Sequence, residues 1–505
     1  MPSAMPASPK LEIVEDKRMF SRQFLLAPRA MDVPPGWKRT GIGGFILHSA
    51  PDLPLIALAH AEGEGLILGW PIHQGRLLCD GETAAVSESA CAPLFTGISG
   101  RFLILEVRGG VLRAYPDPCG LLPAVYCPSQ RVFASSSGLI PSIEDCGDDV
   151  ELQAAFDIPA KSNWYPFGLT GRRNVRRLLP NHVLDLETFV AGRYWPDTDL
   201  HALRDGSETG PMVAEIARLL RENVGAVAAQ DQVMCNLTAG RDSRMMLAAA
   251  RDHVDDITFS TFRFPDRTGA GDTEMASRIA ARFGLRHSIL DCLDPIEADL
   301  ADWLRDTGTC VAGRTLQLAT TSKHVARMAR FSLTGLAGEL GRSVDWRKAD
   351  AGETSLSTDM LLKRLGVDVQ RLPPSVEAAG DVWRAALGPV PLSLQLDIAL
   401  VDLWLGSCSG PSFYGHCHGG ISISPFNDRR IIDLMLRLPH RYRIEQRLTI
   451  DLLDLMWPEL NLFPFNPATS GRRARWRDRF RAAYKRLKNA IPRKFDKTIL
   501  AGRKL

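Results

Sequence analysis

The chain has 505 residues, a hydrophobic fraction of 45% and a charged fraction of 24%, which is typical of a globular enzyme. No run approaches the roughly 18 uninterrupted apolar residues of a membrane span. Residues 1–18 lack the basic start and apolar core of a secretory signal. Ten cysteines include no C-x-x-C pair, so we expect reduced thiols in a cytoplasmic protein. His416, Cys417 and His418 are adjacent and would point to alternate faces, which favours a plain loop over a metal site.

The net charge of +3 is unevenly distributed along the chain. Residues 471–505 hold 14 Lys/Arg and 2 Asp/Glu, so the preceding residues carry a net charge of about −9. Within this segment, apolar side chains recur at helical spacing among basic ones, which predicts a basic amphipathic helical tail. These apolar residues are Trp476, Phe480, Ala483, Tyr484, Leu487 and Ile491.

Three roles are open for this tail. It suits an anionic membrane surface, which would place the protein at the membrane periphery, or a peptide or polysaccharide partner. Alternatively, its aromatic side packs on the protein and its basic side is solvated. Nucleic acid is the weakest candidate, because the rest of the chain is acidic and the aromatic residues have core-like spacing.

The first 150 residues, in round numbers, predict a β-rich domain. Short apolar runs at residues 43–47, 55–58 and 102–107 are separated by Gly, Pro and Asp turns. A cluster of Pro, Asp and Thr near residues 196–199 marks the best domain boundary. We therefore assign residues 1–195 to a first domain with its connector, residues 205–470 to a second domain, and residues 471–505 to the tail.

After Pro211 strands alternate with helices, which predicts an α/β domain with a parallel sheet. We expect helices over residues 212–227, 244–251 and 272–283, and strands over residues 233–237, 257–264, 287–293 and 331–333. Asp272 is expected to cap the third helix and Gly284 to end it. From Ser355 onward the pattern predicts a mainly helical extension.

A candidate nucleotide loop joins the first strand of this domain to the next helix. It consists of Leu237, Thr238, Ala239, Gly240, Arg241, Asp242 and Ser243. Small residues let the backbone approach a polyphosphate, and the helix that follows presents N–H groups and its positive dipole end. The hydroxyls of Thr238 and Ser243 add donors. A carboxylate among phosphates is understandable as a ligand of Mg²⁺, so we expect Asp242 to hold this ion.

Two alternatives accompany this interpretation. A motif this short also occurs as an ordinary strand-to-helix turn with small residues. Arg241 and Arg244 are candidates to clamp phosphate groups, but either side chain is equally compatible with an exposed position on the first helical turn.

The loop resembles the S-G-G-x-D-S signature of the ATP pyrophosphatase (PP-loop) superfamily, in its asparagine synthetase-like branch, with Thr and Ala at the first two positions. Residues 272–287 resemble the family's next helix, and residues 333–340 resemble its L-S-G-x-G-x-D-E-L loop. Residues 425–428 resemble its P-F-L-D segment. Residues 100–102, 117–120, 133–136 and 177–182 are similar to a class II glutaminase domain and its connector. The resemblance spans roughly residues 43–464.

The resemblance implies a PP-loop fold of the adenine nucleotide α-hydrolase type, preceded by an Ntn-glutaminase-like domain. It also implies an amide-forming ligase that uses ATP and Mg²⁺ and activates a small-molecule or peptide carboxylate as an acyl-adenylate. An amine or ammonia then attacks, and AMP and pyrophosphate are released. Thr334 and Gly335 would line the nucleotide pocket, with Ser260 at its adenine end.

Three departures from the family pattern weaken this expectation. The glutaminase needs an N-terminal cysteine, but residue 2 is Pro and the first cysteine is Cys79, so we expect a degenerate glutaminase domain. Glu339 alone represents the Asp-Glu pair in a shortened loop, as a second Mg²⁺ ligand or as an ordinary loop glutamate. Arg447 is the nearest match to a catalytic lysine, but Arg cannot donate a proton at neutral pH. The alternative function is a degenerate scaffold that binds a nucleotide or a biosynthetic partner.

Overall fold

The structure is a computed structural model that describes residues 19–61, 63–86, 96–196, 208–264, 267–312, 316–325, 327–416 and 420–466. The predicted tail at residues 471–505 and the predicted boundary at residues 197–199 lie outside these residues. So do Cys417 and His418.

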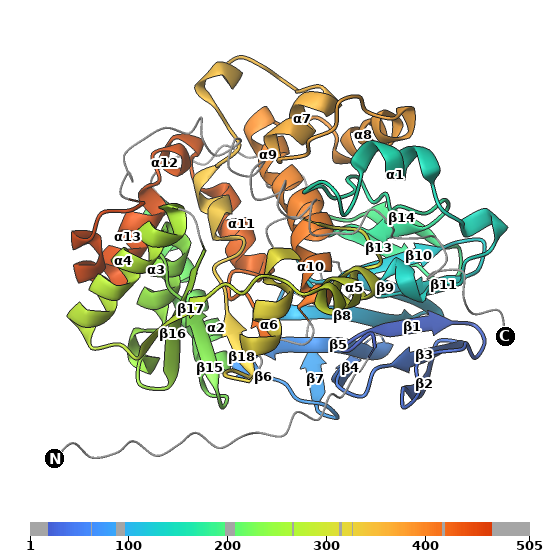
Figure 1. Ribbon diagram of the computed structural model, residues 1–505, viewed down its shortest axis with the longest axis horizontal. Helices are drawn as coiled ribbons and strands as arrows, with labels where there is room; N and C mark the ends of the chain where they lie inside the picture. Colours follow the sequence, from blue (N-terminus) through green and yellow to red (C-terminus); the bar gives the residue numbers. More distant parts are fainter. Residues whose placement is uncertain are drawn as a thin grey trace.

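Two mostly antiparallel sheets form the N-terminal half of the described chain (Figure 1). One has the order β12-β10-β11-β1-β3-β2, with strands β1 (Phe24–Ala27), β2 (Lys38–Ile42), β3 (Phe45–Ser49), β10 (Ala124–Cys127), β11 (Val132–Ala134) and β12 (Arg176–Leu178). The other has the order β14-β13-β9-β8-β5-β4-β7, and β6 pairs with β5. Its strands are β4 (Leu55–His60), β5 (Gly63–His73), β6 (Arg76–Leu77), β7 (Thr83–Val86), β8 (Ile98–Arg108), β9 (Val111–Pro116), β13 (His182–Asp185) and β14 (Val190–Arg193). The prediction of a β-rich N-terminal region is confirmed.

The central strand β8 is buried on both faces. Leu103 and Leu105 point into the main core, whereas Phe102 and Ile104 point into a smaller core on the opposite face. This division follows from the alternation of side chains along a strand. It explains why residues 102–105 form a continuous apolar run rather than an alternating one.

A parallel sheet forms the second half of the described chain and lies at the other side of the molecule in Figure 1. Its order is β17-β16-β15-β18-β19, and every neighbouring pair is parallel. The strands are β15 (Val233–Asn236), β16 (Ile257–Arg263), β17 (His287–Asp291), β18 (Phe331–Leu333) and β19 (Ile421–Ile423). The predicted parallel α/β arrangement is confirmed. The edge strand β19 was not predicted, because it is short and lies within the region expected to be helical.

Within the described part of the chain, all α-helices except the first follow residue 208. Helices α1 to α7 are α1 (Val150–Phe156), α2 (Thr209–Ala228), α3 (Arg241–Ala249), α4 (Arg267–Phe283), α5 (Glu297–Thr307), α6 (Ala319–Val325) and α7 (Thr358–Arg364). Helices α8 to α13 are α8 (Pro374–Leu387), α9 (Leu392–Ala399), α10 (Gly410–Gly415), α11 (Arg429–Arg437), α12 (His440–Ile444) and α13 (Arg447–Met456).

Two helix starts differ from the prediction. Helix α3 begins three residues earlier than expected, which places residues 241–243 in its first turn. Helix α4 begins five residues earlier, so Asp272 lies inside the helix and is not its cap. Gly284 follows α4 with a φ of +66°, a left-handed conformation that glycine adopts without strain, so the predicted helix end is confirmed.

One continuous helical segment, from α9 through the π-helix η9 (Leu400–Ser409) to α10, packs between the two halves. Among the described residues, only this segment is long and apolar enough to cross a membrane, but 83% of its apolar window is buried inside the protein. Its two acidic residues have buried cationic partners. Asp397 pairs with Arg443 at 2.5 Å, and Asp402 pairs with Arg193 at 2.6 Å. These ion pairs allow the carboxylates to remain in the core.

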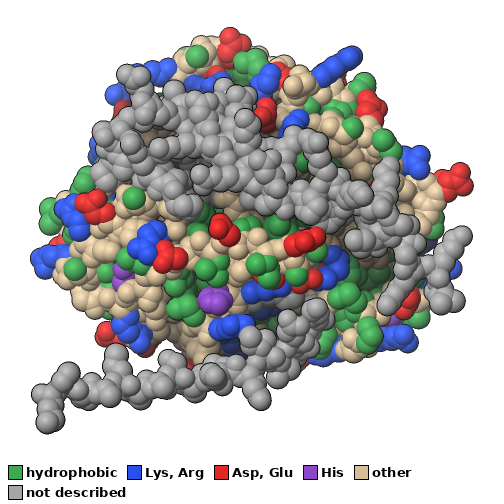
Figure 2. Space-filling model, in the orientation of Figure 1, with side chains coloured by type: hydrophobic (Ala, Val, Ile, Leu, Met, Phe, Trp, Pro, Cys, Tyr) green, Lys and Arg blue, Asp and Glu red, His purple; other side chains and the backbone are tan. Residues whose placement is uncertain are grey.

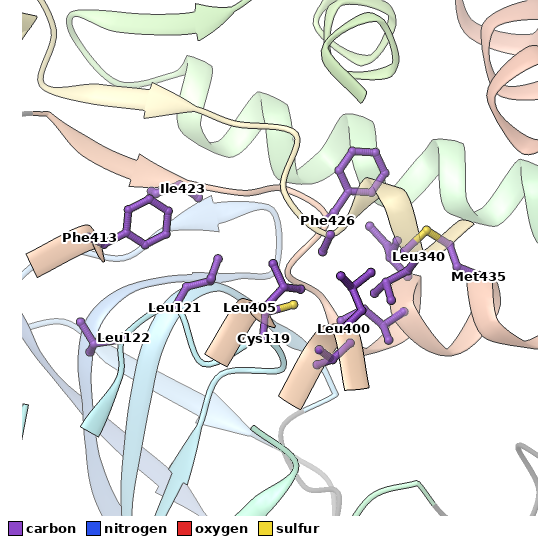
Figure 3. Packing of buried hydrophobic residues seen from close by; sticks show 14 of the residues in the cluster. Cys119, Leu121, Leu122, Leu340, Leu400, Leu405, Phe413, Ile423, Phe426 and Met435 are labelled. Carbon is purple, nitrogen blue, oxygen red and sulfur yellow. The ribbon is translucent and has the colours of Figure 1, made fainter. Parts of the chain in front are cut away.

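Close packing joins this helical segment to the loop after β9. Figure 3 shows Leu405 of η9 beside Cys119, with Leu121 close by. A Cβ added at Gly410 would lie 2.2 Å from the carbonyl oxygen of Gly120, so only glycine permits this approach.

Asn427 connects the two halves through its side chain. Its Nδ2 donates hydrogen bonds to the Gly100 carbonyl at 2.6 Å and to Asp117 Oδ1 at 2.7 Å. Its Oδ1 accepts one from the Cys119 N–H at 3.0 Å. Because Asn427 is fully buried, these bonds fix the segment after β19 against the N-terminal sheets and, with it, the edge of the parallel sheet.

Candidate functional site

The loop between β15 and α3 is held in shape by its own hydroxyl groups. Thr238 Oγ1 and Ser243 Oγ share a hydrogen bond of 2.9 Å. Thr238 Oγ1 also accepts from the Gly240 N–H at 3.0 Å, and Ser243 Oγ accepts from the Thr238 N–H at 3.1 Å. These hydroxyls therefore shape the loop in addition to any contact with a ligand, and the first turn of α3 follows directly.

Neighbouring strand ends brace the same loop. Leu237 is buried, donates its N–H to the Ser260 carbonyl at 2.8 Å and accepts from Thr261 Oγ1 at 2.7 Å. The Ala239 N–H donates to Asp272 Oδ1 at 3.0 Å. Asp272 thus supports the loop from α4 instead of capping that helix. Ser260 lies in β16 with its Oγ 3.3 Å from Asn236 Oδ1, next to the loop.

A second loop, between β18 and the 3₁₀ helix η7 (Gly338–Arg342), packs on the first at Asp242. A Cβ at Gly335 would lie 2.8 Å from Asp242 Cβ, and a Cβ at Gly338 would lie 2.9 Å from Asp242 Oδ1. Arg342, from the end of η7, donates to both carboxylate oxygens of Asp242, at 2.8 and 2.6 Å. The two predicted loops therefore meet, and their contact depends on two glycines and one ion pair.

Glu339 is half-buried close to Asp242. Burial and the negative charge of Asp242 raise the pKa of Glu339 to about 7, against the opposing charge of Arg342. Burial also raises the pKa of Asp242, although Arg342 opposes this shift. The two predicted metal ligands are therefore neighbours. Across the described part of the chain, no group of three or more His, Cys, Asp or Glu side chains could hold a metal.

Several buried donors around these loops have no hydrogen-bond partner among the described residues. They are the Nε atoms of Arg241, Arg244 and Arg342 and the Oγ1 of Thr334. Thr334 follows β18, and its N–H donates to the Ile423 carbonyl at 3.0 Å, which places it beside Gly335 at the same sheet edge. Unpaired buried donors are costly, so their presence together indicates a site that offers hydrogen bonds to acceptors.

Arg244 has a structural partner that the sequence did not reveal. It is fully buried and donates to the carbonyls of Phe463 and Pro464 at 2.6 Å each and of Ala239 at 3.1 Å. The Asn466 N–H donates to the Ala239 carbonyl at 3.0 Å. Residues 463–466, which we call the strap, are thereby fastened to the loop. The predicted alternative of an exposed Arg244 is wrong, because the side chain is fully buried, whereas the phosphate-clamp role stays a prediction.

Arg241 takes a different position beside the strap. Its guanidinium carbon lies 4.5 Å from the ring centroid of Phe465, and that of Arg244 lies 4.4 Å from the same ring. Such contacts are cation–π interactions. The Nε of Arg241 has no hydrogen-bond partner among the described residues and is available to a ligand. Arg244 also keeps an unpartnered Nε, but its two other guanidinium nitrogens are bonded to carbonyls.

Arg447 is the first residue of α13 and is exposed, whereas the neighbouring Leu448 packs against Gly341 of η7. The cation that reaches η7 from this region is Arg443, which donates to the Leu340 carbonyl at 3.3 Å and to Asp397. Arg443 is buried and committed to that ion pair. The structure therefore does not bring Arg447 into contact with the two loops.

The predicted residues thus fall into two groups. The structure brings together residues 237–243, Thr334, Gly335 and Glu339, with Ser260 behind the loop, and leaves Arg447 on the surface. The sequence analysis missed Arg342 and the strap, and it assigned Asp272 to a helix cap rather than to the support of the loop. A cation three residues after Glu339 was a usable signal for Arg342, but nothing in the sequence indicated the strap.

The charges on the visible surface are mixed. On the face in Figure 2, basic and acidic side chains of the described residues are interspersed.

A scan of the sequence against protein-family models gives no match, and a search of the curated proteins gives no significant match. Function must therefore be argued from the geometry of the site.

Proposed function

We propose that the chain is an AMP-forming, ATP-dependent carbon–nitrogen ligase of the asparagine synthetase type, without glutaminase activity of its own. In this proposal the parallel sheet is a PP-loop domain, and the N-terminal sheets descend from an Ntn-type glutaminase. The observation that carries the proposal is the presence of unpartnered buried donors on Arg241, Arg342 and Thr334, which belong to the two loops that meet at Asp242. Polyphosphate oxygens are acceptors that match such donors.

The proposed ATP site uses groups at one edge of the parallel sheet. The N–H groups of residues 238–240 are already bonded within the fold, so phosphates would meet the first turn of α3 and its positive dipole end. Arg241 and Arg342 supply positive charge, and Thr334 supplies a hydroxyl. These groups would neutralise charge and hold the α-phosphorus in line with a substrate carboxylate.

The residues present fit Mg²⁺ in this proposal. Nucleotide-bound Mg²⁺ takes one or two carboxylates, with phosphate oxygens and water as the other ligands, so a set of two acidic residues is sufficient. Asp242 and Glu339 form such a pair: burial first, and then the charge of Asp242, raises the pKa of Glu339, and a cation would offset both effects. Arg342, which donates to both oxygens of Asp242, would have to share this carboxylate with the ion. The ion would neutralise phosphate charge, and Asp242 and Glu339 would hold it.

The cysteine positions support the absence of a working glutaminase. Cys79 lies in the turn between β6 and β7, after six strands of the N-terminal sheets. Cys119 is fully buried beside Asp117, and burial raises the pKa of its thiol well above the ordinary value. Neither residue suits a nucleophile at a chain terminus, so free ammonia or an amine on the substrate is the proposed nucleophile.

A degenerate scaffold is the second candidate, and Arg447 favours it. A ligase needs a group that stabilises the developing charge when the amine attacks, yet Arg447 is exposed and Arg443 is committed to Asp397. A scaffold would retain nucleotide or partner binding and would lack turnover.

Calorimetric titration of Mg²⁺-ATP tests the proposal. Wild type should bind, Asp242→Ala should lose binding, and Thr334→Val should bind about tenfold more weakly because one hydrogen-bond donor is removed. Asp381→Ala, at a 74% exposed side chain, is the matched control and should bind like wild type.

The outcomes separate the two candidate functions. Binding of Mg²⁺-ATP, followed by release of AMP and pyrophosphate when a carboxylate and an amine are added, supports the ligase. Binding without turnover across a panel of carboxylates supports the scaffold, and no binding by the folded wild type contradicts both nucleotide roles.

A further inference from the structure

Two cysteines in the N-terminal half face each other. Cys127 ends β10, and Cys146 ends the short 3₁₀ helix η2 (Glu144–Cys146). Their Sγ atoms are 2.7 Å apart, and Ser129 Oγ lies 3.5 Å from the first and 3.4 Å from the second. The sulfurs are closer than two relaxed, separate thiols would pack. The side chains are therefore already directed at each other.

The cysteines belong to a small core that is separate from the main one. It packs on the sheet containing β10 and includes Leu25, Ala27, Val125, Val132, Ala134, Ile140 and Val175. Residues 137–146 contribute to its cover as short 3₁₀ turns and loop rather than as a long helix. A small core stabilises its cover only weakly, because little apolar area is removed from water. A covalent link at this position would therefore add to the hydrogen bonds by which Arg172 already holds the carbonyls of this segment.

Cys146 lies at the border between this small core and the protein surface. The side chain is buried, but residues 141–145 immediately before it are exposed. Arg172 lies beside this turn and donates its Nε to the Cys146 carbonyl at 2.8 Å. Burial alone would raise the pKa of the Cys146 thiol, but hydrogen bonds with Cys127, Ser129 and Gln130 and the charge of Arg172 bring it below the ordinary value. Burial raises the pKa of Cys127, so Cys146 is the better nucleophile.

We propose that Cys127 and Cys146 form an oxidisable dithiol, a modification site at which a small-molecule disulfide converts the two thiols into an intramolecular disulfide. The Cys146 thiolate attacks one sulfur of the small disulfide, forms a mixed disulfide and releases one small thiol. The Cys127 sulfur then attacks Cys146 Sγ, and the second small thiol leaves. The protons of both cysteines end on the two released thiols, and the small disulfide is the species reduced. The product links β10 to the turn before α1.

Oxidation of the full-length, reduced protein with defined mixtures of oxidised and reduced glutathione tests this site. After acid quenching, mass spectrometry should find peptides joined through Cys127 and Cys146. The intact mass should fall by two hydrogen atoms, and dithiothreitol should reverse both changes. Cys127→Ser should instead accumulate glutathione on Cys146, because the resolving thiol is missing. Cys79→Ser, at an exposed cysteine, is the matched control and should keep the link.

Two results would overturn the proposal, and both come from wild type, so they do not depend on the folding of a variant. The first is glutathione on exposed cysteines with no link between Cys127 and Cys146 at a fully oxidising ratio. The second is a link that forms only after denaturation. In either case the two thiols merely pack together in the folded protein.

Discussion

Asp242 and Arg342 are separated by 100 residues in sequence, and one guanidinium nitrogen of Arg342 donates to both carboxylate oxygens of Asp242. This pair holds the loop after β18 against the loop after β15. Because the Asp242 and Arg342 side chains are only 28% and 14% exposed, solvent screens the pair less than a surface ion pair. The opposite charges of Asp242 and Arg342 therefore help to hold the two loops of the candidate site together.

Removal of Arg342 should destabilise the protein. Arg342→Gln leaves the mostly buried Asp242 carboxylate without its cation, and we expect the free energy of unfolding to fall by about 1–3 kcal/mol. Urea denaturation measures this change. Arg441→Gln breaks the exposed pair with Glu445 and should cause no measurable change. Equal effects of the two substitutions would show that the Asp242–Arg342 pair contributes no more to the free energy of unfolding than an exposed ion pair.

Asp345 and Asp350 should affect the pH dependence of stability in opposite directions, although both interact with Arg364. Burial and the charge of Asp397 raise the pKa of Asp345 to about 6. Its contribution to stability is present below the unfolded pKa of about 3.9 and is lost as the pH rises through 6. Asp345→Asn should therefore be more stable than wild type at pH 7, by about 1–2 kcal/mol, and not at pH 3.5.

Substitution of Asp350 should have the opposite effect on the pH dependence of the free energy of unfolding. Hydrogen bonds from Arg364 lower the pKa of this carboxyl. Its contribution is present above the unfolded pKa of about 3.9 and is lost as the pH falls through the lower folded value. Asp350→Asn should be less stable than wild type at pH 7, with a smaller deficit in acid. If both variants shift in the same direction, the assignment of opposite pKa shifts is wrong.

Arg244 should control the strap. Arg244→Gln removes hydrogen bonds to the carbonyls of Phe463 and Pro464, and we expect a loss of about 2–3 kcal/mol in the free energy of unfolding. Hydrogen exchange at the Asn466 amide, which donates to Ala239, should become faster. Arg251→Gln is the matched control, because Arg251 donates to the Met456 carbonyl elsewhere. Unchanged exchange at Asn466 in Arg244→Gln would contradict this role.

Asn427 should couple the two halves of the molecule. Asn427→Leu leaves the Gly100 carbonyl, Asp117 and the Cys119 N–H without a shared partner in a fully buried position, and we expect a loss of at least about 3 kcal/mol. Urea unfolding followed by tryptophan fluorescence and by circular dichroism should give separate midpoints in this variant. Asn461→Ala, at an exposed hydrogen bond, should keep a single transition. Coincident transitions in Asn427→Leu would count against coupling through this residue.

Sequence reasoning recovered the features that depend on local pattern. Apolar runs predicted the strands, and small residues between β15 and α3 predicted the loop. Features made by distant residues were not accessible. Arg244 resembles a surface side chain until residues more than 200 positions later cover it. Arg447 was chosen by spacing, but Gln446 has a φ of +59° and breaks the helix between α12 and α13. After this break Arg443 is buried and Arg447 is exposed, which residue spacing alone does not predict.

The strap also fixes the C-terminal end of the described chain beside the candidate site. Asn466, the last described residue, donates its N–H to the Ala239 carbonyl in the loop before α3. Arg244 holds the two residues Phe463 and Pro464 just before it. Loss of the strap would therefore free the loop and this end of the described chain together.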